Sequence, residues 1–470
     1  MRTIFCVLSL FFCITIFGQD VTIQVQNGIT NLEKDPQFKH AILSMYVVDS
    51  KTGKVVFDKN SEVGLAPASC QKVITSASAF ELLGKGYRYK TEIYAGKQDP
   101  NSIHFDGITL VGFGDPTLGS WRFFANKPYD FLNSIKVGLT QIKGDIISSI
   151  YIDNSKWGTQ IIPNGWVWED IGNYYGAGAS SFNWKENQYD IVLQSGKNIG
   201  DKVKILSGEN RLLTKYVNEL LTAGSNTGDN AYIYFDLDKR IRYLRGTIPL
   251  STKPITITGA VQNGSDLVRE YLFSQKEIIG KNELNINSIS SYFDELNHHI
   301  IEPQIDLKLL NTHYSPTLDS INYWFLKKSI NLYGEAFVKT IGYQKKGVGA
   351  TDTGLSIIKY FWKQRGIDPS AINIIDGSGL SPANRITTNA LVTVMQFAKK
   401  QNWFSSFYNA LPDMNGIKMK DGYISGVRSY TGYVKSKSGN DYTFAFIVNN
   451  FYGSAATVKE KMWKVLNILK

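Results

Sequence analysis

Cysteine is scarce in this chain of 470 residues, and the positions of its three copies exclude a framework of disulfide bonds. Cys6 and Cys13 lie in an apolar N-terminal segment that we expect to be removed, which leaves Cys70 without a partner for an internal disulfide. Lipid attachment at Cys13 is the alternative, but Phe11 and Phe12 stand where such a signal requires small residues.

Histidine is also rare, with five copies, and only the pair His298-His299 with Glu302 suggests a metal site. Adjacent histidines on an extended chain point in opposite directions, and no third ligand is spaced nearby. The sequence therefore predicts no metal site.

Long apolar runs are absent after the first 20 residues, so no later segment is expected to span a membrane. At the start, Arg2 precedes the apolar run Ile4 to Phe17, and Gly18 precedes the polar pair Gln19-Asp20. This order is typical of a secretory signal peptide, here residues 1–18, and the run is too short to cross a bilayer comfortably. We expect an exported protein with no integral membrane segment after signal cleavage.

Runs of lysine and arginine are absent too, although the formal net charge is +10 at pH 7. A basic excess of this size favours contact with an acidic polymer or a membrane surface, or it is simply a solvated basic surface. An exported chain without a basic run gives no reason to expect nucleic acid as a partner.

The mature chain of about 450 residues exceeds what one hydrophobic core usually serves, so two or three domains are expected. Residues 91–300 contain five of the nine tryptophans and alternate in short apolar runs, which predicts an inserted β-rich region. Outside it, the patterns predict helices at 69–83, 322–341, 354–362, 389–399 and 454–469, and strands at 41–48, 54–58, 417–424, 429–435 and 442–449. The two ends of the chain are expected to build one α/β domain around one antiparallel sheet.

The segment Ser69-Cys70-Gln71-Lys72 carries the first chemical signal. Pro67 introduces a helix, and Ser69 lies in its first turn. Unpaired N–H groups and the helix dipole stabilise negative charge that develops on the serine oxygen there. Lys72 lies three residues on, on the same face, and can act as a base when it is desolvated beside another cation. The structural alternative is an N-capping serine beside an unrelated lysine. Cys70 is rotated about 100° away from Ser69, which predicts buried packing.

One group of serine acyl-transfer enzymes follows S-x-x-K with S-x-N and then K-T-G along the chain. Ser356 to Lys359 also matches S-x-x-K, but this segment lies within a predicted amphipathic helix. Four S-x-N matches begin at Ser181, Ser320, Ser329 and Ser438. We favour Ser329 with Asn331, because a short loop that leads into a helix lets both side chains project back into a cleft. Ser181 and Ser438 lie in turn-like contexts, and Ser320 is interpreted as a helix cap.

Three segments compete for the third motif. Lys51-Thr52-Gly53 matches it literally but precedes Ser69 and falls in a predicted hairpin turn, and Lys437-Ser438-Gly439 also falls in a turn. Lys420-Asp421-Gly422 is imperfect, yet it lies on the first of the three last strands, which should border the cleft. Strand counting therefore favours Lys420.

Together with longer segments, these motifs resemble the S13 peptidase family, the D-Ala-D-Ala carboxypeptidase/endopeptidases also called class C low-molecular-mass penicillin-binding proteins. Pro67 to Lys72 is similar to the family's nucleophile segment, and Gly112 to Leu118 is similar to its G-x-G-D-P-T-L stretch. Further matches are Pro163, Gly165, Trp166, Trp168, Asp170, Tyr175-Gly176-Ala177, His313, Ser315-Pro316, Leu318, Asp376 to Ser381 and Asn384-Arg385. The resemblance covers most of the chain from about residue 40 to 452.

The resemblance implies an α/β (α+β) fold: a penicillin-binding-protein/β-lactamase-like transpeptidase domain, with an antiparallel sheet flanked by helices and a large β-rich insertion between S-x-x-K and S-x-N. In this chain 260 residues separate Ser69 from Ser329, which agrees with the change of composition and apolar pattern over residues 91–300. We expect the catalytic domain at 19–90 and 301–470, an inserted β-rich domain at 91–170 and 255–300, and a second inserted module at 171–254.

The function that the resemblance implies is a serine-type D-Ala-D-Ala carboxypeptidase/endopeptidase acting on peptidoglycan stem peptides in the periplasm, with β-lactam antibiotics as covalent inhibitors. Ser69 would attack the carbonyl between two D-alanines, Lys72 would take its proton, and Ser329 would relay a proton to the leaving amine. The substrate-binding residues would be Asn331, Lys420, Asp421, Gly422, Tyr423 and Asp115. The backbone N–H groups of Ser69 and Tyr423 would form the oxyanion hole, and neither a metal nor an organic cofactor is needed. Asp115 and Arg385 either touch substrate or only fix loops.

Asp421 departs from the family, because it stands where a hydroxyl is expected. Strand alternation could turn its carboxylate away, Lys420 or Arg428 could neutralise it, or the site could bind free carboxylates poorly. We expect neutralisation combined with weakened binding. Two other functions stay open: a β-lactamase-like hydrolase, which the insertion disfavours, and a non-catalytic peptidoglycan-binding pseudoenzyme, which Asp421 motivates.

Overall fold

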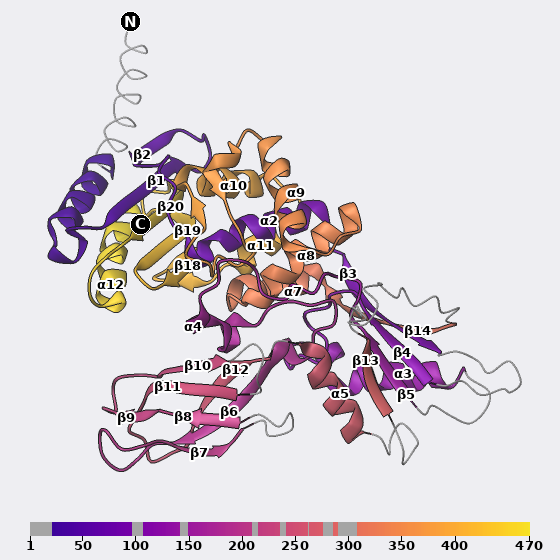
Figure 1. Cartoon of the computed structure of the whole chain (residues 1–470). Helices are drawn as coiled ribbons and strands as arrows, with labels where there is room; N and C mark the ends of the chain where they lie inside the picture. Colours follow the sequence, from indigo (N-terminus) through magenta and orange to yellow (C-terminus); the bar gives the residue numbers. More distant parts are fainter. Residues whose placement is uncertain are drawn as a thin grey trace, which may run out of the picture. The chain divides into compact units, whose positions relative to one another are not determined.

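The computed structural model describes residues 21–95, 107–141, 149–208, 215–235, 241–261, 263–275, 285–289 and 308–470 (Figure 1). The expected signal peptide and the group His298, His299 and Glu302 lie outside these residues. The chain divides into two compact units. The first comprises Met1–Leu82, Asn322–Ser329 and Leu355–Lys470, and the second comprises Leu83–Ile321 and Ile330–Gly354.

A six-stranded antiparallel sheet forms the centre of the first unit, with the order β17-β18-β19-β20-β1-β2. Its strands are β1 (Ile42–Asp49), β2 (Val55–Lys59), β17 (Asp413–Met414), β18 (Ile417–Ile424), β19 (Val427–Lys435) and β20 (Asp441–Asn449). The N-terminal hairpin pairs with β20, so both ends of the chain build one sheet, as predicted. Strand β20 is buried along nearly its whole length, which explains why its sequence is almost continuously apolar.

Helices cover both faces of this sheet. The first unit begins with a helix over residues 21–34. Its further helices are α2 (Lys72–Leu82), α10 (Thr388–Lys399), α11 (Phe404–Ala410), α12 (Ala455–Leu466) and most of α7 (Leu318–Lys327) and α9 (Thr351–Lys363). On one face, Val458 and Met462 of α12 pack with Phe444 and Phe446 of β20. On the other face, α10 contacts the sheet through a hydrogen bond from the Tyr433 hydroxyl to the Met395 carbonyl (2.6 Å).

The second unit is rich in β-strands. A five-stranded sheet has the order β13-β5-β4-β3-β14, a three-stranded sheet has the order β12-β6-β7, and strands β8, β9 and β10 pair with or flank β11. The bounds are β3 (Arg88–Ala95), β4 (Gly107–Gly112), β5 (Ser149–Asp153), β6 (Gln188–Gln194), β7 (Lys204–Ser207), β8 (Lys215–Asn218), β9 (Leu221–Ala223), β10 (Asn230–Phe235), β11 (Ile241–Pro249), β12 (Ile255–Ala260), β13 (Asn285–Ile289) and β14 (Leu309–Thr317). Helices α3 (Pro128–Leu139), α4 (Trp168–Ile171), α5 (Gly264–Ser274) and α8 (Asn331–Lys346) accompany these sheets.

The predicted elements of the first unit are confirmed, with three corrections. The helix expected at 322–341 is two helices, because α7 ends at Lys327 and α8 begins at Asn331. Between them Ser329 has a φ of 56°, a left-handed conformation that interrupts helical hydrogen bonding. Ser320 is not a helix cap but lies inside α7, and Ser69 lies in a 3₁₀ turn that precedes α2 rather than in the α-helix itself. The division of the insertion into two modules stays a prediction.

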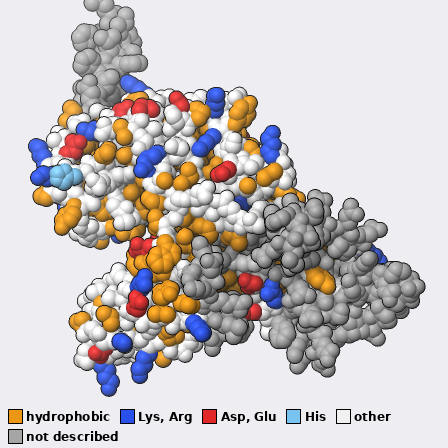
Figure 2. All heavy atoms as spheres, viewed as in Figure 1, with side chains coloured by type: hydrophobic (Ala, Val, Ile, Leu, Met, Phe, Trp, Pro, Cys, Tyr) orange, Lys and Arg blue, Asp and Glu red, His pale blue; other side chains and the backbone are white. Residues whose placement is uncertain are grey.

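The surface gives no sign of a concentrated basic patch in the view of Figure 2. Lysine and arginine side chains are spread singly over the visible described surface, among acidic and apolar ones. No helix within the described residues is both long and apolar enough to cross a bilayer.

Candidate active site

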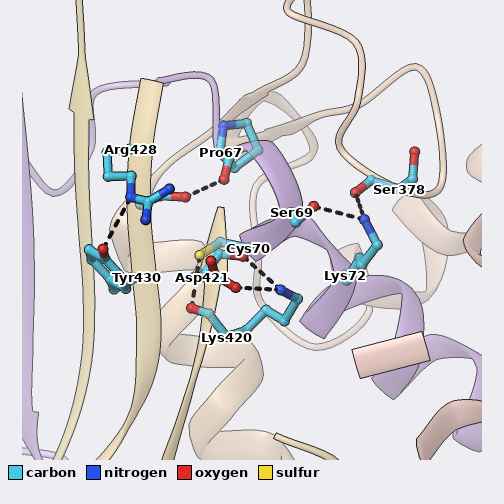
Figure 3. Close-up of polar contacts among 10 residues, drawn as sticks. Pro67, Ser69, Cys70, Lys72, Ser378, Lys420, Asp421, Arg428 and Tyr430 are labelled. Atoms are coloured by element: carbon cyan, nitrogen blue, oxygen red, sulfur yellow. Dashed lines mark hydrogen bonds and ion pairs between the residues drawn. The ribbon is translucent and has the colours of Figure 1, made fainter. Parts of the chain in front are cut away.

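Ser69 sits in a short 3₁₀ turn, Ala68–Gln71, that leads directly into α2. The turn begins at Pro67, and Ala68 has a φ of 45°, so the backbone bends sharply just before the serine. Lys72 is the first residue of α2, and its side chain is fully buried. Its Nζ lies 2.9 Å from Ser69 Oγ (Figure 3). The predicted nucleophile and base are thus within hydrogen-bonding distance of each other.

Lys72 is held by a second contact that the sequence did not reveal. Its Nζ donates a hydrogen bond of 2.6 Å to the backbone carbonyl of Ser378 (Figure 3), and it lies 5.9 Å from the centre of the Phe325 ring. When the carbonyl holds one N–H of a neutral lysine amine, the lone pair of the amine can point toward the serine hydroxyl. Glycines flank Ser378 in the sequence, which marks a loop but does not indicate which carbonyl faces the lysine.

Strand β18 lies directly beside the turn that carries Ser69. The Cys70 thiol donates to the Lys420 carbonyl (3.2 Å), and the Ser429 hydroxyl of β19 donates to the Pro67 carbonyl (2.5 Å). A Cβ on Gly422 would lie 2.9 Å from the Ser69 nitrogen and 2.2 Å from Ser429 Oγ, so only glycine fits there.

These contacts bear on the choice among the three K-T-G candidates. Lys420 lies on the strand that borders Ser69, as strand counting predicted. Lys51 lies in the turn between β1 and β2, and Lys437 lies in the turn between β19 and β20.

Lys420 and Asp421 form an ion pair on β18. Lys420 is 1% exposed, and its Nζ lies 2.9 Å from Asp421 Oδ1 and donates to the Asp421 carbonyl (2.8 Å). Burial opposes ionisation of Asp421, but the positive charges of Lys420 and Arg428 outweigh it, so the pKa of this carboxyl lies below its ordinary value. Asp421 is therefore an ionised carboxylate neutralised by its neighbour, and it is one-third exposed rather than turned into the core.

Arg428 lies on β19, opposite Tyr423 in the register of the β18–β19 pair. Its Nε donates to the Tyr430 hydroxyl (3.1 Å), and its guanidinium stacks near the rings of Tyr423 and Tyr430, 5.3 and 5.7 Å from their centres. Tyr423 is 54% exposed, and the predicted contribution to the oxyanion hole concerns its backbone N–H.

Cys70 is excluded as a competing nucleophile. Its side chain is fully buried, and burial raises the pKa of the thiol to about 12. The predicted packing role is confirmed. The other S-x-x-K match, Ser356 with Lys359, lies within α9, as expected.

The second motif spans the boundary between the two units. Ser329 belongs to the first unit, and its positive φ shows a strained backbone at this position. Asn331 belongs to the second unit, where it begins α8 and its amide donates to the Tyr175 carbonyl (2.8 Å).

Asp115 and Arg385 both make contacts that fix loops. Asp115 lies buried in the second unit and accepts hydrogen bonds from the Thr117 amide (2.8 Å) and hydroxyl (2.6 Å). Burial raises the pKa of Asp115 to about 6. Arg385 donates to the carbonyls of Pro382 (2.6 Å) and Asn384 (2.7 Å). No group of three or more potential metal ligands occurs in the part of the chain that the structure describes.

Comparisons with known proteins identify the fold and the family of this chain. A D-alanyl-D-alanine carboxypeptidase from Actinomadura sp. (strain R39) is 24% identical over 461 residues, which cover 92% of this chain and 82% of the relative. Penicillin binding protein 4 from Haemophilus influenzae shares the fold, with a TM-score of 0.73 at 19% identity over 96% of this chain and 99% of the other. Its complex with a β-lactam gives a TM-score of 0.71 at 18% identity, over 92% and 96% of the two chains. The sequence model of one family, described as D-Ala-D-Ala carboxypeptidase 3 (S13), matches residues 25–469, and this chain therefore belongs to that family.

Proposed function

We propose that this protein is a serine-type D-Ala-D-Ala carboxypeptidase/endopeptidase that cleaves peptidoglycan stem peptides through an acyl-enzyme. The observation that carries the proposal is the distance of 2.9 Å between Lys72 Nζ and Ser69 Oγ at the start of a buried helix. Membership of the S13 family supports the choice of substrate.

In the proposed reaction, Ser69 Oγ attacks the carbonyl carbon between two D-alanines while Lys72 takes the hydroxyl proton. The carbonyl oxygen becomes an oxyanion that the backbone N–H groups of Ser69 and Tyr423 stabilise, each by a few kcal/mol. The close approach of Gly422 to the Ser69 nitrogen supports this pairing of donors, because Tyr423 is the next residue of β18.

Collapse of the tetrahedral intermediate breaks the C–N bond, and the leaving amine receives a proton. We assign this proton relay to Ser329 and substrate binding to Asn331, on the S-x-N motif. Water then hydrolyses the ester and regenerates Ser69. Lys420 is assigned to the C-terminal side of the substrate, with its charge reduced by Asp421.

A β-lactam would acylate Ser69 in the same way, because its ring amide presents the same kind of carbonyl. The complex of Haemophilus influenzae penicillin binding protein 4 with a β-lactam supports this extension. The predicted export signal and the substrate both favour the periplasm as the place of action.

A non-catalytic peptidoglycan-binding role is the second candidate, and Asp421 is the observation that favours it. The ionised Asp421 offsets the charge of Lys420, which weakens attraction for a free carboxylate. The hydrogen-bonding distance between Lys72 and Ser69 argues against it, because a binding role does not require a base beside the serine.

A fluorescent penicillin tests these functions. We expect stable labelling of the wild type and, by mass spectrometry, an adduct on the peptide that contains Ser69. Ser69→Ala should lose the label, whereas the matched control Ser356→Ala, in the second S-x-x-K sequence, should keep it. Rapid turnover of the label would indicate a β-lactamase-like hydrolase, and no labelling would indicate a binding protein. An undiminished adduct in Ser69→Ala would refute the assignment of the nucleophile.

A further inference from the structure

The buried carboxylate of Asp376 lies at the centre of the loop that contacts Lys72. Its side chain is fully buried. Oδ1 accepts hydrogen bonds from the Gly379 amide (2.8 Å), Asn384 Nδ2 (2.9 Å) and Gln71 Nε2 (3.0 Å), and Oδ2 accepts one from the Ser381 amide (2.7 Å). Two main-chain and two side-chain amides thus hold the carboxylate.

One of these bonds ends on a peptide group that also touches the catalytic lysine. The Gly379 N–H and the Ser378 carbonyl belong to the same peptide unit. Its N–H donates to Asp376 Oδ1, and its carbonyl accepts from Lys72 Nζ at 2.6 Å. Because a peptide unit is planar and rigid, fixing the N–H also fixes the direction of the carbonyl.

The contacts therefore form a continuous chain: Asp376 carboxylate, Ser378–Gly379 peptide group, Lys72 amine and Ser69 hydroxyl. We propose that Asp376 is a positioning residue that orients Lys72 toward Ser69 through this peptide group. The arrangement has the logic of a catalytic triad, in which a third group orients the base. Here a peptide group relays the influence of the carboxylate. This inference rests on the proposed function of Ser69 and Lys72.

The physical effect has two parts. The peptide carbonyl takes up one donor of Lys72, so the amine lone pair can be directed at the serine proton. When Lys72 has received that proton, its ammonium is stabilised by the carbonyl, which a carboxylate on the other end of the same peptide group polarises further. No proton passes to Asp376.

Packing around Gly379 shows that the position of this peptide group is strictly constrained. Gly379 has a φ of 83°, and a Cβ there would lie 2.0 Å from the Ala68 carbonyl oxygen, in the turn that carries Ser69. Thr75 of α2 also donates to the neighbouring Gly377 carbonyl (2.7 Å). The loop therefore packs closely against both the turn that carries Ser69 and helix α2, which carries Lys72.

The test is the acylation of purified Asp376→Asn by penicillin, measured over a range of penicillin concentrations. An asparagine has the same shape but no negative charge, so it cannot polarise the Ser378–Gly379 peptide group as the carboxylate does, and its Nδ2 cannot accept from the amide that it faces. We expect the maximal acylation rate constant to fall at least tenfold, whereas the apparent dissociation constant of the reversible penicillin complex changes less than twofold. If the variant had only lost stability in the loop, the acylation rate constant would not fall more than the affinity for penicillin.

Asn384→Ala is the matched control, because it removes another donor to the same Oδ1 and leaves the Gly379 bond in place. We expect its acylation rate constant to fall less than threefold, even at an equal loss of melting temperature. Asp376→Ser replaces Asp376→Asn if the latter does not fold.

Equal losses of rate in Asp376→Asn and Asn384→Ala would overturn the inference, since both would then reflect loosening of the loop. So would acylation of Asp376→Asn at the wild-type rate. A wild type that penicillin does not acylate would instead refute the proposed function itself.

Discussion

Replacement of Asp421 by threonine restores the hydroxyl that the S13 resemblance leads one to expect at this position. In the structure, Asp421 is ionised and forms an ion pair with Lys420, with 2.9 Å between Asp421 Oδ1 and Lys420 Nζ. We expect Asp421→Thr to be acylated faster than the wild type, both by penicillin and by D-Ala-D-Ala peptides. The reason is that Lys420 becomes free to attract the carboxylate that these ligands carry.

The magnitude follows from two charges. A ligand carboxylate about 4 Å from both the Lys420 ammonium and the Asp421 carboxylate feels an attraction and a repulsion of about 4 kcal/mol each, at an effective dielectric near 20. In the wild type these energies nearly cancel. In the variant the attraction remains, but solvent and salt reduce it, because Asp421 is 33% exposed. About 1.4–2.8 kcal/mol remains, which corresponds to a ten- to hundredfold faster second-order acylation.

The same change has a cost in stability. Lys420 is 1% exposed and loses its carboxylate partner, although its bond to the backbone carbonyl of residue 421 remains. We expect the free energy of unfolding to fall by about 1–3 kcal/mol.

Acylation rates of the two proteins should be compared at pH 7, at low and high salt. Asp421→Asn is the matched control, because it removes the charge without adding a hydroxyl. If charge is the cause, both variants gain and the gain shrinks as salt increases. An unchanged or slower rate for Asp421→Thr would refute the reasoning and would mean that the carboxylate lies outside the site or takes part in the chemistry.

Three further changes test the packing and the electrostatics. Gly422→Ala should abolish acylation, because its Cβ would lie 2.2–2.9 Å from atoms around the nucleophile, whereas Gly86→Ala, with no atom within 4 Å, should acylate normally; equal rates would contradict this. Burial lowers the pKa of His313 from 6.5 to about 4, so the unfolded state takes up the proton first as the pH falls, and folding stability is lost below pH 6.5. In urea unfolding, the stability deficit of His313→Gln relative to wild type should shrink by about 2–3 kcal/mol from pH 7 to 4.5, and a constant deficit would contradict the buried neutral state. Tyr333→Phe removes the hydroxyl that donates to the buried Glu186 (2.7 Å) and should lower the free energy of unfolding by about 1–2 kcal/mol, whereas a change below 0.5 kcal/mol would show that this bond contributes little.

Local patterns in the sequence were sufficient for most elements of the first unit, although the helix over residues 21–34 and α11 were not predicted. The strands of the central sheet alternate or are continuously apolar, and the helices have caps such as Ser454, whose side chain accepts from the Ala456 amide. A further exception is the region of Ser329, where the apolar periodicity continues through a break in the helix. One residue in the left-handed conformation does not change the spacing of apolar residues in the sequence, so the break in the helix could not be predicted.

The sequence by itself was sufficient to predict that Ser69 and Lys72 lie close together. The spacing of Ser69 and Lys72 places them one helical turn apart, because the geometry of a helix depends only on local backbone angles. The order of the last strands was sufficient to favour Lys420 over Lys51 and Lys437. These inferences use contacts that are either local or fixed by strand pairing.

Only the tertiary structure decided what surrounds those residues. The Ser378 carbonyl reaches Lys72 from 306 positions away in the chain, and a backbone carbonyl has no side-chain identity that a sequence could display. The pairing of Asp421 with Lys420, rather than its rotation away from Ser69, depends on side-chain torsions and on the field of Arg428 from the neighbouring strand. Such contacts arise from long-range packing, which brings together atoms whose positions no local pattern specifies.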